Sequence, residues 1–157
     1  EVAGRQLGQL DILVNNAGVT HQSGPMETVT EDEFDRVMAV NNKAVYLAAR
    51  AFVPAMKAAG KGCILNIAST AGVSPRPNLS WYNASKGWMI TATRAMAVEL
   101  ARYGVRVNAV NPVAGETPLL ASFMGEDTHQ VDGRSERDRE RSVEVHRMAG
   151  RGATEVE

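Results

Sequence analysis

The chain has 157 residues, which is enough for one domain with its own hydrophobic core. Apolar residues make up 44% of it and the formal net charge is −1, which argues against a basic nucleic-acid-binding or membrane-surface protein. No apolar run approaches the ~20 residues of a membrane-spanning helix, and the single cysteine, Cys63, has no internal disulfide partner. We therefore expect a cytoplasmic protein without a nucleic-acid or membrane partner.

The first predicted element is a strand. Residues 1–8 contain no initiator methionine and resemble the end of a helix that runs into this strand. Residues 11–15 form a short apolar run with β-branched members, which predicts a buried parallel strand. The sequence Asn15-Asn16-Ala17-Gly18 closes the strand, and the polar residues 19–29 predict a loop.

A long helix is predicted over residues 30–59. Thr30 and Glu33 have the spacing of a capping box, and acidic residues occupy the first turn, where the helix dipole favours them. Apolar residues then recur three and four positions apart, which is the helical period. Pro54 predicts a kink near the end of the helix, and Gly60 predicts its stop.

The elements then repeat. Residues 62–68 predict a second strand, residues 69–79 a loop, and a second long helix runs from residue 80 or 81 to residue 103. Gly104 predicts its end, and residues 105–111 predict a third strand. This alternation predicts an α/β fold: a partial, Rossmann-like, doubly wound parallel sheet, an incomplete three-layer α/β/α arrangement.

Polar residues follow each predicted strand. They are Asn15-Asn16, Ser69 and Asn111-Pro112. Doubly wound sheets bind their ligands outside the carboxyl ends of their strands. We therefore expect these residues to meet at one edge of the sheet and to form a binding site there.

The character of the sequence changes after Gly125. Residues 126–157 alternate Arg, Asp and Glu densely and contain few large apolar residues. Such a segment cannot bury enough apolar surface to offset its ordering entropy, so it predicts a charged tail that is disordered or forms a lone, poorly anchored helix, without a closing strand. Its composition is also that of GC-rich DNA read in a shifted frame, which is an alternative origin for the tail.

Tyr82 and Lys86 are the candidate catalytic pair. They are four residues apart on the second predicted helix, so their side chains share one face. An ammonium group beside a phenol favours the phenolate, which predicts a lowered pKa for Tyr82 and proton transfer near neutral pH. The alternative is that the pair has no catalytic role and is an exposed lysine beside a half-buried tyrosine.

Several motifs together resemble the short-chain dehydrogenase/reductase family. In that family's order and spacing they are Asn15-Asn16-Ala17-Gly18, Asn41, Ser69, Tyr82 and Lys86. The resemblance implies that residues 1–125 are a partial NAD(P)-binding domain of an oxidoreductase that interconverts an alcohol and a ketone. It implies NAD or NADP as cofactor, a small-molecule alcohol or ketone as substrate, and a homodimer or homotetramer for the full-length parent.

The resemblance also implies a role for each catalytic residue. Tyr82 is the general acid and base, and Ser69 holds the substrate oxygen. Lys86 lowers the pKa of Tyr82 and binds the nicotinamide ribose. Asn41 completes a proton relay to Lys86 through ordered water.

Simpler roles remain open for some of these residues. Ser69 fits a helix or turn cap equally well. Asn41 and Asn42 are adjacent; Asn41 fits the family register, which makes Asn42 a surface neighbour. Asn15 and Asn16 fit residues that close a strand with side-chain hydrogen bonds.

The implied cofactor-binding residues are Asn15, Asn16, Ala17, Gly18, Tyr82, Lys86, Pro112, Gly115 and Thr117. Val113 departs from the family, in which a glycine usually follows the proline. The sequence holds no glycine-rich phosphate loop, so we expect residues 1–157 alone to bind a dinucleotide weakly. A catalytically silent scaffold or oligomerisation fragment is the rival function. The three histidines are scattered without ligand spacing, so no metal site is predicted.

Overall fold

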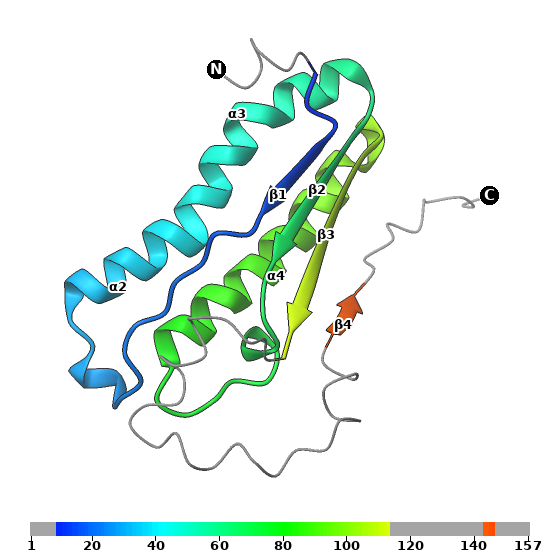
Figure 1. Ribbon diagram of the computed structural model, residues 1–157. Coiled ribbons are helices and arrows are strands. Elements are labelled where there is room, and N and C mark those ends of the chain that lie inside the picture. Colours follow the sequence, from blue (N-terminus) through cyan, green and yellow to red (C-terminus); the bar gives the residue numbers. More distant parts are fainter. Residues whose placement is uncertain (1–8, 114–142, 147–157) are drawn as a thin grey trace.

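The computed structural model describes residues 9–113 and 143–146. Its sheet has the strand order β1-β2-β3-β4 (Figure 1). Strands β1 (Ile12–Asn15), β2 (Gly62–Ile67) and β3 (Val105–Pro112) are parallel to one another. Each connection between parallel strands contains a helix, as such crossovers require. The structure therefore confirms the predicted α/β fold with a parallel sheet.

The fourth strand, β4 (Val143–His146), corrects one prediction. The sequence pattern predicts no strand in residues 126–157, yet β4 pairs antiparallel with β3, aligning His146 with Ala109. A sheet edge presents backbone N–H and C=O groups that pair with another strand whatever its side chains are. The period of apolar residues therefore did not reveal β4. The rest of the predicted tail lies outside the described residues.

The first connection is not the single long helix that the period predicts. It consists of α2 (Glu31–Met38), a π-helical turn η2 (Ala39–Lys43) and α3 (Ala44–Ala59). The predicted capping box is present at its start: Thr30 Oγ1 accepts the Glu33 N–H at 3.3 Å, and the Glu33 carboxylate accepts the Thr30 N–H at 3.3 Å. The backbone hydrogen bond from Thr30 is the main reason that the pKa of Glu33 is lowered.

The second connection contains α4 (Ser80–Leu100), with the short 3₁₀ turns η3 (Thr70–Gly72) before it and η4 (Ala101–Tyr103) after it. A further 3₁₀ turn, η1 (Met26–Thr28), lies in the loop after β1. Both predicted stops are confirmed, because Gly60 and Gly104 follow the helical segments with φ angles of 66° and 70°. Glycine adopts this left-handed conformation without steric cost.

Both long helices pack against the same face of the sheet. Met56 of α3 and Leu100 of α4 share one core cluster with Ile64, Val105 and Val107 of the strands. In Figure 1 the strands lie in front and α4 lies behind them. The described ranges thus show two layers of the predicted three-layer arrangement. This core lies toward the amino ends of the strands and holds the two helices in register with the sheet.

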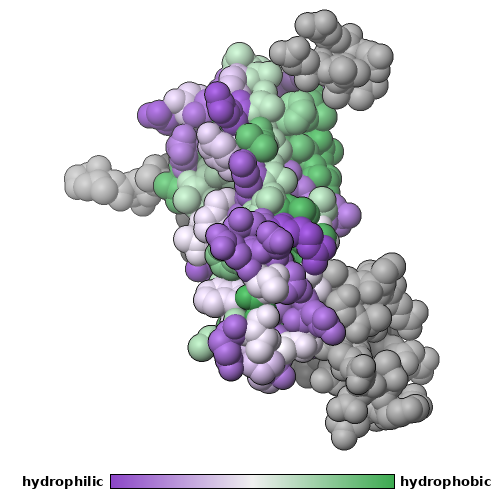
Figure 2. All heavy atoms as spheres, turned by 90° about the vertical axis from the view of Figure 1, so that its left-hand side faces the viewer, coloured by the Kyte–Doolittle hydropathy of each residue, from purple (hydrophilic) through white to green (hydrophobic). Residues whose placement is uncertain are grey.

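Strand β1 is parallel as predicted, but it is not buried. Ile12 is 61% exposed and Val14 is 51% exposed, whereas the alternate residue Leu13 packs on the helix-side core. Successive side chains of a strand point to opposite faces, and none of the described helices covers the face of Ile12 and Val14. Figure 2 shows hydrophobic surface along its right-hand edge, on the side that faces the viewer in Figure 1.

Candidate active site

The carboxyl ends of the parallel strands carry the predicted polar residues. Asn15 ends β1, Ser69 is the second residue after the end of β2, and Pro112 ends β3. Two hydrogen bonds tie this edge together: Thr70 Oγ1 donates to the Pro112 carbonyl at 3.3 Å, and Lys86 Nζ donates to the Ile67 carbonyl at 2.9 Å. The parallel register thus brings residues from three strands to one edge, as the sequence predicts.

Tyr82 and Lys86 project from the same face of α4 into the interior. Each side chain is 4% exposed, so Lys86 is not the exposed lysine of the non-catalytic alternative. Lys86 Nζ lies 5.9 Å from the centroid of the Tyr82 ring. α4 begins at Ser80, so both side chains lie in its first two turns, beside the end of β2.

Burial changes the pKa of both groups. Desolvation lowers the pKa of the Lys86 amine to about 8, because burial disfavours its charged form. For Tyr82, desolvation raises the pKa of the phenol; the side-chain hydrogen bond with Ser69 and the positive charge of Arg76 act in the opposite direction and are weaker. The predicted lowering of the Tyr82 pKa by Lys86 is therefore wrong for this structure. The Lys86 amine donates its hydrogen bond to the Ile67 carbonyl. Burial removes water from around the phenolate and so disfavours the charged form of Tyr82.

Ser69 is a turn cap, as one open alternative predicts, and its role toward the substrate oxygen stays a prediction. Its hydroxyl caps η3 by accepting the Ala71 N–H at 3.1 Å. Its side chain also forms a hydrogen bond with Tyr82. A serine hydroxyl has one donor and two acceptor sites, so the cap and the contact with Tyr82 are compatible.

Asn41 lies in the π-helical turn and is fully buried. Its Oδ1 accepts the Val19 N–H at 2.9 Å, and its Nδ2 donates to the Val19 carbonyl and to Ser85 Oγ, both at 2.9 Å. The side chain thus connects the loop after β1 to α4. Single π-helical turns often occur at functional sites, and this turn sets the direction of Asn41. A role in proton relay stays a prediction.

Asn42 is not the surface neighbour that the family register predicts. It is buried, and its Nδ2 donates to the Ser85 carbonyl at 2.8 Å. A π-helical turn contains an extra residue, which lets two successive asparagines both face α4. The sequence held a sign that Asn42 is buried with a partner: asparagine is unfavourable inside a helix, and two stand side by side here.

Gly18 lies close to two of these residues. A Cβ atom at Gly18 would lie 3.3 Å from Lys86 Nζ and 3.6 Å from Asn41 Oδ1. The absence of a side chain at this position therefore lets the loop after β1 approach the buried Lys86 Nζ closely. Asn16 and Ala17, in the same loop, are exposed.

The side chain of Asn15 forms its hydrogen bond within the interface between the sheet and α4. Its Nδ2 donates to Asn66 Oδ1 at 2.8 Å, and Asn66 Nδ2 donates to Thr93 Oγ1 at 2.8 Å. This chain of amides and a hydroxyl crosses the interface between the sheet and α4. Asn15 therefore closes its strand by a side-chain hydrogen bond, as one of the open alternatives predicts, although its partner is a side chain rather than backbone.

Sequence reasoning missed Gly72, which places the loop of residues 70–79. A Cβ atom there would lie 2.6 Å from the Lys86 carbonyl carbon and 2.7 Å from the Gly87 nitrogen. Only glycine lets the η3 turn approach the α4 backbone this closely. The sequence offered one sign of this contact, because a glycine three residues after Ser69 in a predicted loop is typical of a close backbone approach.

Two hollows lie between the loop after β2 and the first turns of α4, and the smaller one contacts Ser69 and Tyr82. The smaller one, of about 20 Å³, is lined by Ser69, Thr70, Ala71, Arg76, Leu79, Tyr82 and Val113. It has room for one water-sized group. An open groove of about 570 Å³ is lined by Ala71, Gly72, Pro75, Arg76, Pro77, Ser80, Asn83, Ala84 and Gly87. The two hollows share Ala71 and Arg76.

Comparison with known proteins agrees with this geometry. The family model for short chain dehydrogenases matches residues 1–127. The chain belongs to the short-chain dehydrogenase family. The 4-formylbenzenesulfonate dehydrogenase of Comamonas testosteroni is 56% identical over 124 residues, covering 78% of this chain and 49% of the relative. The 2-(R)-hydroxypropyl-CoM dehydrogenase of Xanthobacter autotrophicus is 45% identical over 116 residues, covering 73% and 46%.

Solved structures of this family have the same fold. The crystal structure of a 3-ketoacyl-(acyl-carrier-protein) reductase from Brucella melitensis, complexed with NADH, is 51% identical with a TM-score of 0.77, covering 78% of this chain and 52% of that one. A gluconate 5-dehydrogenase from Burkholderia cenocepacia, in complex with NADP and tartrate, is 36% identical with a TM-score of 0.72, covering 75% and 46%. The chain spans about half the length of the curated relatives it matches.

The implied catalytic residues lie in or beside the first turns of α4; they are Asn41, Ser69, Tyr82 and Lys86. Two of the implied cofactor-binding residues, Gly115 and Thr117, lie outside the described residues. No group of three or more potential metal ligands occurs within residues 9–113 and 143–146. In those same ranges, no helix has both the length and the apolarity to cross a membrane.

Proposed function

We propose that this chain carries the catalytic half of an oxidoreductase that interconverts an alcohol and a ketone, with Tyr82 as general acid and base. The observation that carries the proposal is the contact between Ser69 and Tyr82 beside a hollow the size of one small group. A carbonyl oxygen in that hollow lies within reach of two hydroxyl donors. Hydrogen-bond donors aimed at an oxygen stabilise the charge that develops on it during reduction.

Tyr82 then donates its phenolic proton to the substrate oxygen in reduction and takes it back in oxidation. Its raised pKa keeps the phenol protonated at neutral pH, which suits the acid role. Ser69 holds the substrate oxygen while the proton moves.

We infer that NADH or NADPH is the cofactor, and that a bound nicotinamide supplies the hydride. Lys86 and Gly18 fit such a group, because the missing side chain at Gly18 keeps the loop after β1 clear of the Lys86 amine, a hydrogen-bond donor that can bind a ribose hydroxyl. With a pKa of about 8, Lys86 is mostly protonated at pH 7 and acts as a hydrogen-bond donor there. Two relatives of known structure were solved with NADH and with NADP, which supports this choice.

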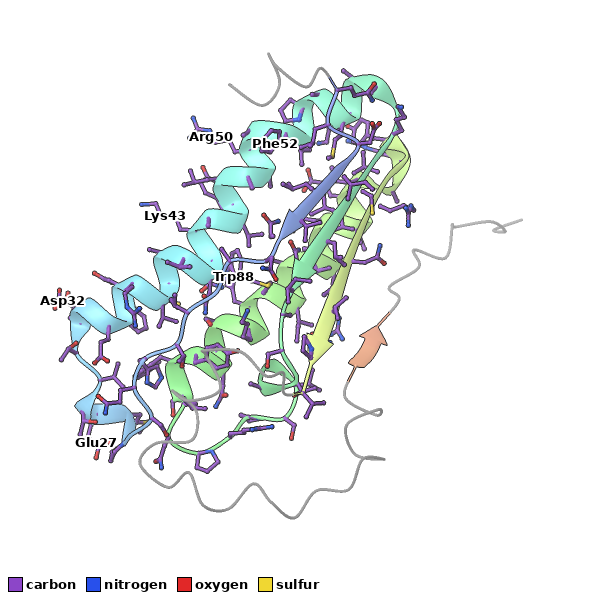
Figure 3. The ribbon with its side chains drawn as sticks, in the orientation of Figure 1. Glu27, Asp32, Lys43, Arg50, Phe52 and Trp88 are labelled. Atoms are coloured by element: carbon purple, nitrogen blue, oxygen red, sulfur yellow. The ribbon has the colours of Figure 1, made fainter. Side chains whose placement is uncertain are left out.

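The proposal is tested by reduction of a panel of small ketones, using NADH and NADPH in turn, by the natural polypeptide that carries residues 1–157. Lys86→Met should both lower turnover and weaken cofactor binding, because the amine is proposed to serve both. Lys43→Met is the matched control, since Lys43 is exposed and points away from the strands in Figure 3. Absence of turnover with either cofactor, or unchanged binding and turnover in Lys86→Met, would contradict the proposal.

A second function, self-association through the helical layer, is favoured by a separate observation. Four large apolar side chains on the outer faces of α3 and α4 are exposed: Tyr46, Leu47, Trp88 and Val98. Apolar surface exposed on adjacent helices is typical of an interface. We propose that the chain forms a homo-oligomer there. Analytical ultracentrifugation of wild type and a Leu47→Asp, Trp88→Asp double variant tests this, and equal masses would exclude it.

A further inference from the structure

Arg76 joins the two hollows beside the candidate catalytic residues. It lines the small hollow together with Ser69 and Tyr82, and it lines the open groove together with Pro75, Pro77 and Ala84. Among the residues that line either hollow, Arg76 is the one that carries a formal charge. A molecule that occupies both hollows therefore contacts Arg76.

The backbone of Arg76 is anchored while its side chain is exposed. Asn83 Nδ2, on α4, donates to the Arg76 carbonyl at 2.7 Å. The side chain has no ion pair with a carboxylate of the described residues, where the salt bridges are Lys57–Glu99 and Lys61–Asp11. A guanidinium on an anchored backbone, without a carboxylate partner among the described residues, can bind an external anion.

The surroundings of Arg76 set the shape of that anion. The groove presents mainly small and apolar groups, from Ala71, Pro75, Pro77, Ala84 and Gly87. These favour an apolar body, and the planar fork of arginine favours a carboxylate or a sulfonate, which it binds through two parallel hydrogen bonds. Ser69 and Tyr82, which we propose to contact the reacting oxygen, line the smaller hollow together with Arg76.

We propose that Arg76 is a specificity-determining residue that selects substrates with an apolar body and an anionic group near the reacting carbonyl or alcohol. The inference rests on the proposed function for the identity of the reacting group. It goes beyond that function by assigning the substrate's charge. Arg76 is not a catalytic residue in this assignment, because it binds a part of the substrate that does not react.

The first test measures binding and does not depend on turnover. Benzoate and benzamide have nearly the same shape but differ in charge, and their affinities for the natural polypeptide are measured by calorimetry. We expect benzoate to bind about tenfold more tightly, since a hydrogen-bonded charge pair contributes more than a neutral contact. Arg76→Gln should abolish this preference, and Arg76→Lys should restore part of it.

Arg50→Gln is the matched control. Arg50 is exposed on α3 and points away from the sheet in Figure 3, so its loss removes the same charge without touching either hollow. The preference for benzoate should persist in this variant. Equal affinities for benzoate and benzamide in the wild type, or a preference that persists in Arg76→Gln, would overturn the proposal.

The second test separates specificity from an action through Tyr82. Reduction of 4-acetylbenzoate is compared with reduction of its neutral methyl ester. Arg76→Gln should raise KM about tenfold for the anion and leave KM for the ester within threefold. Equal changes of KM for the two ketones, together with a fall in kcat and a shifted pH profile, would instead show that Arg76 acts through Tyr82. A protein that reduces neither ketone but still distinguishes benzoate through Arg76 contradicts the proposed reaction and not the anion site.

Discussion

The two ends of the interface between the sheet and its helices differ in chemistry. At the amino ends of the strands, Met56 and Leu100 pack on Ile64, Val105 and Val107 in an apolar cluster. Toward the carboxyl ends, the same layers bury a lysine, two serines and several asparagines. The side chains of Lys86, Asn41 and Asn66 are among those that form hydrogen bonds there. One packing surface thus has an apolar end and a polar end.

The difference shows how the fold supports a site. Burying a polar group is unfavourable unless it finds a hydrogen-bond partner, whereas burying apolar surface is favourable by itself. The buried atoms without a partner in the described ranges are His21 Nε2, Asn42 Oδ1, Asn83 Oδ1 and Asn111 Oδ1. None of them belongs to a residue of the apolar cluster. The apolar end therefore supplies stability, and the polar end supplies chemistry at some expense of stability.

The largest expected effect is on catalysis at the polar end. Tyr82→Phe removes the proposed proton donor, and a positioned acid or base typically contributes 10²–10⁴-fold to the rate. We expect turnover of the natural polypeptide to fall by about that factor while cofactor affinity stays within about threefold. Steady-state kinetics and cofactor fluorescence measure the two quantities. Tyr46→Phe is the control, since Tyr46 is exposed on α3; a Tyr82→Phe variant with near-normal kcat would refute the assignment.

The next effect is on stability at the apolar end. Leu100→Ala leaves a cavity in a fully formed core, which typically lowers the free energy of unfolding by about 2–5 kcal/mol. Urea denaturation measures the loss. Val98→Ala, two residues away on α4 and 81% exposed, should change stability by less than about 0.5 kcal/mol. Similar losses in the two variants would show that the cluster is not the stabilising core.

The contact between η3 and α4 gives a pair of glycine variants with opposite signs. Gly72→Ala should destabilise by about 1–3 kcal/mol, because its Cβ would meet the α4 backbone at 2.6 Å. Gly87→Ala should stabilise by up to about 1 kcal/mol, because its Cβ would meet the nearest atom at 3.5 Å and alanine favours a helix. Thermal denaturation compares them. A neutral Gly72→Ala would mean that the turn does not rest on α4.

The smallest effect concerns pH. The pKa of Lys86 is lowered from 10.5 to about 8, so between these values the unfolded chain binds more protons than the folded one. Stability must then rise with pH in that window. We expect a gain of about 1–2 kcal/mol between pH 8 and pH 9.5 in the wild type, measured by urea denaturation. The slope should flatten in Lys86→Met and persist in Lys61→Met; an equal slope in all three would mean that Lys86 is not buried as described.

Local sequence patterns predicted the elements and their ends well. The capping box at Thr30, the stops at Gly60 and Gly104 and the three parallel strands follow from interactions between near neighbours in the chain. The spacing of Tyr82 and Lys86 placed both on one helical face, because the helix repeat alone determines that face. The candidate catalytic residues were therefore accessible from the sequence and its family resemblance.

Other features depend on contacts between distant segments. The π-helical turn that buries Asn42 exists where α2 and α3 meet α4, and the exposure of Ile12 depends on which helices cover the sheet. The pairing of β4 with β3 arises from backbone groups, which carry no side-chain pattern.

The sequence by itself determined which residues form the helices and strands and which side chains share a face, because these depend on short-range periodicity and capping. Only the tertiary structure decided the charge state of the site. Burial at the sheet edge raises the pKa of Tyr82 and lowers that of Lys86, reversing the prediction from their spacing for the tyrosine. The structure also decided that Arg76 lies between the two hollows. The physical reason is that desolvation and groove shape depend on everything packed around a residue, and spacing along the chain does not record this.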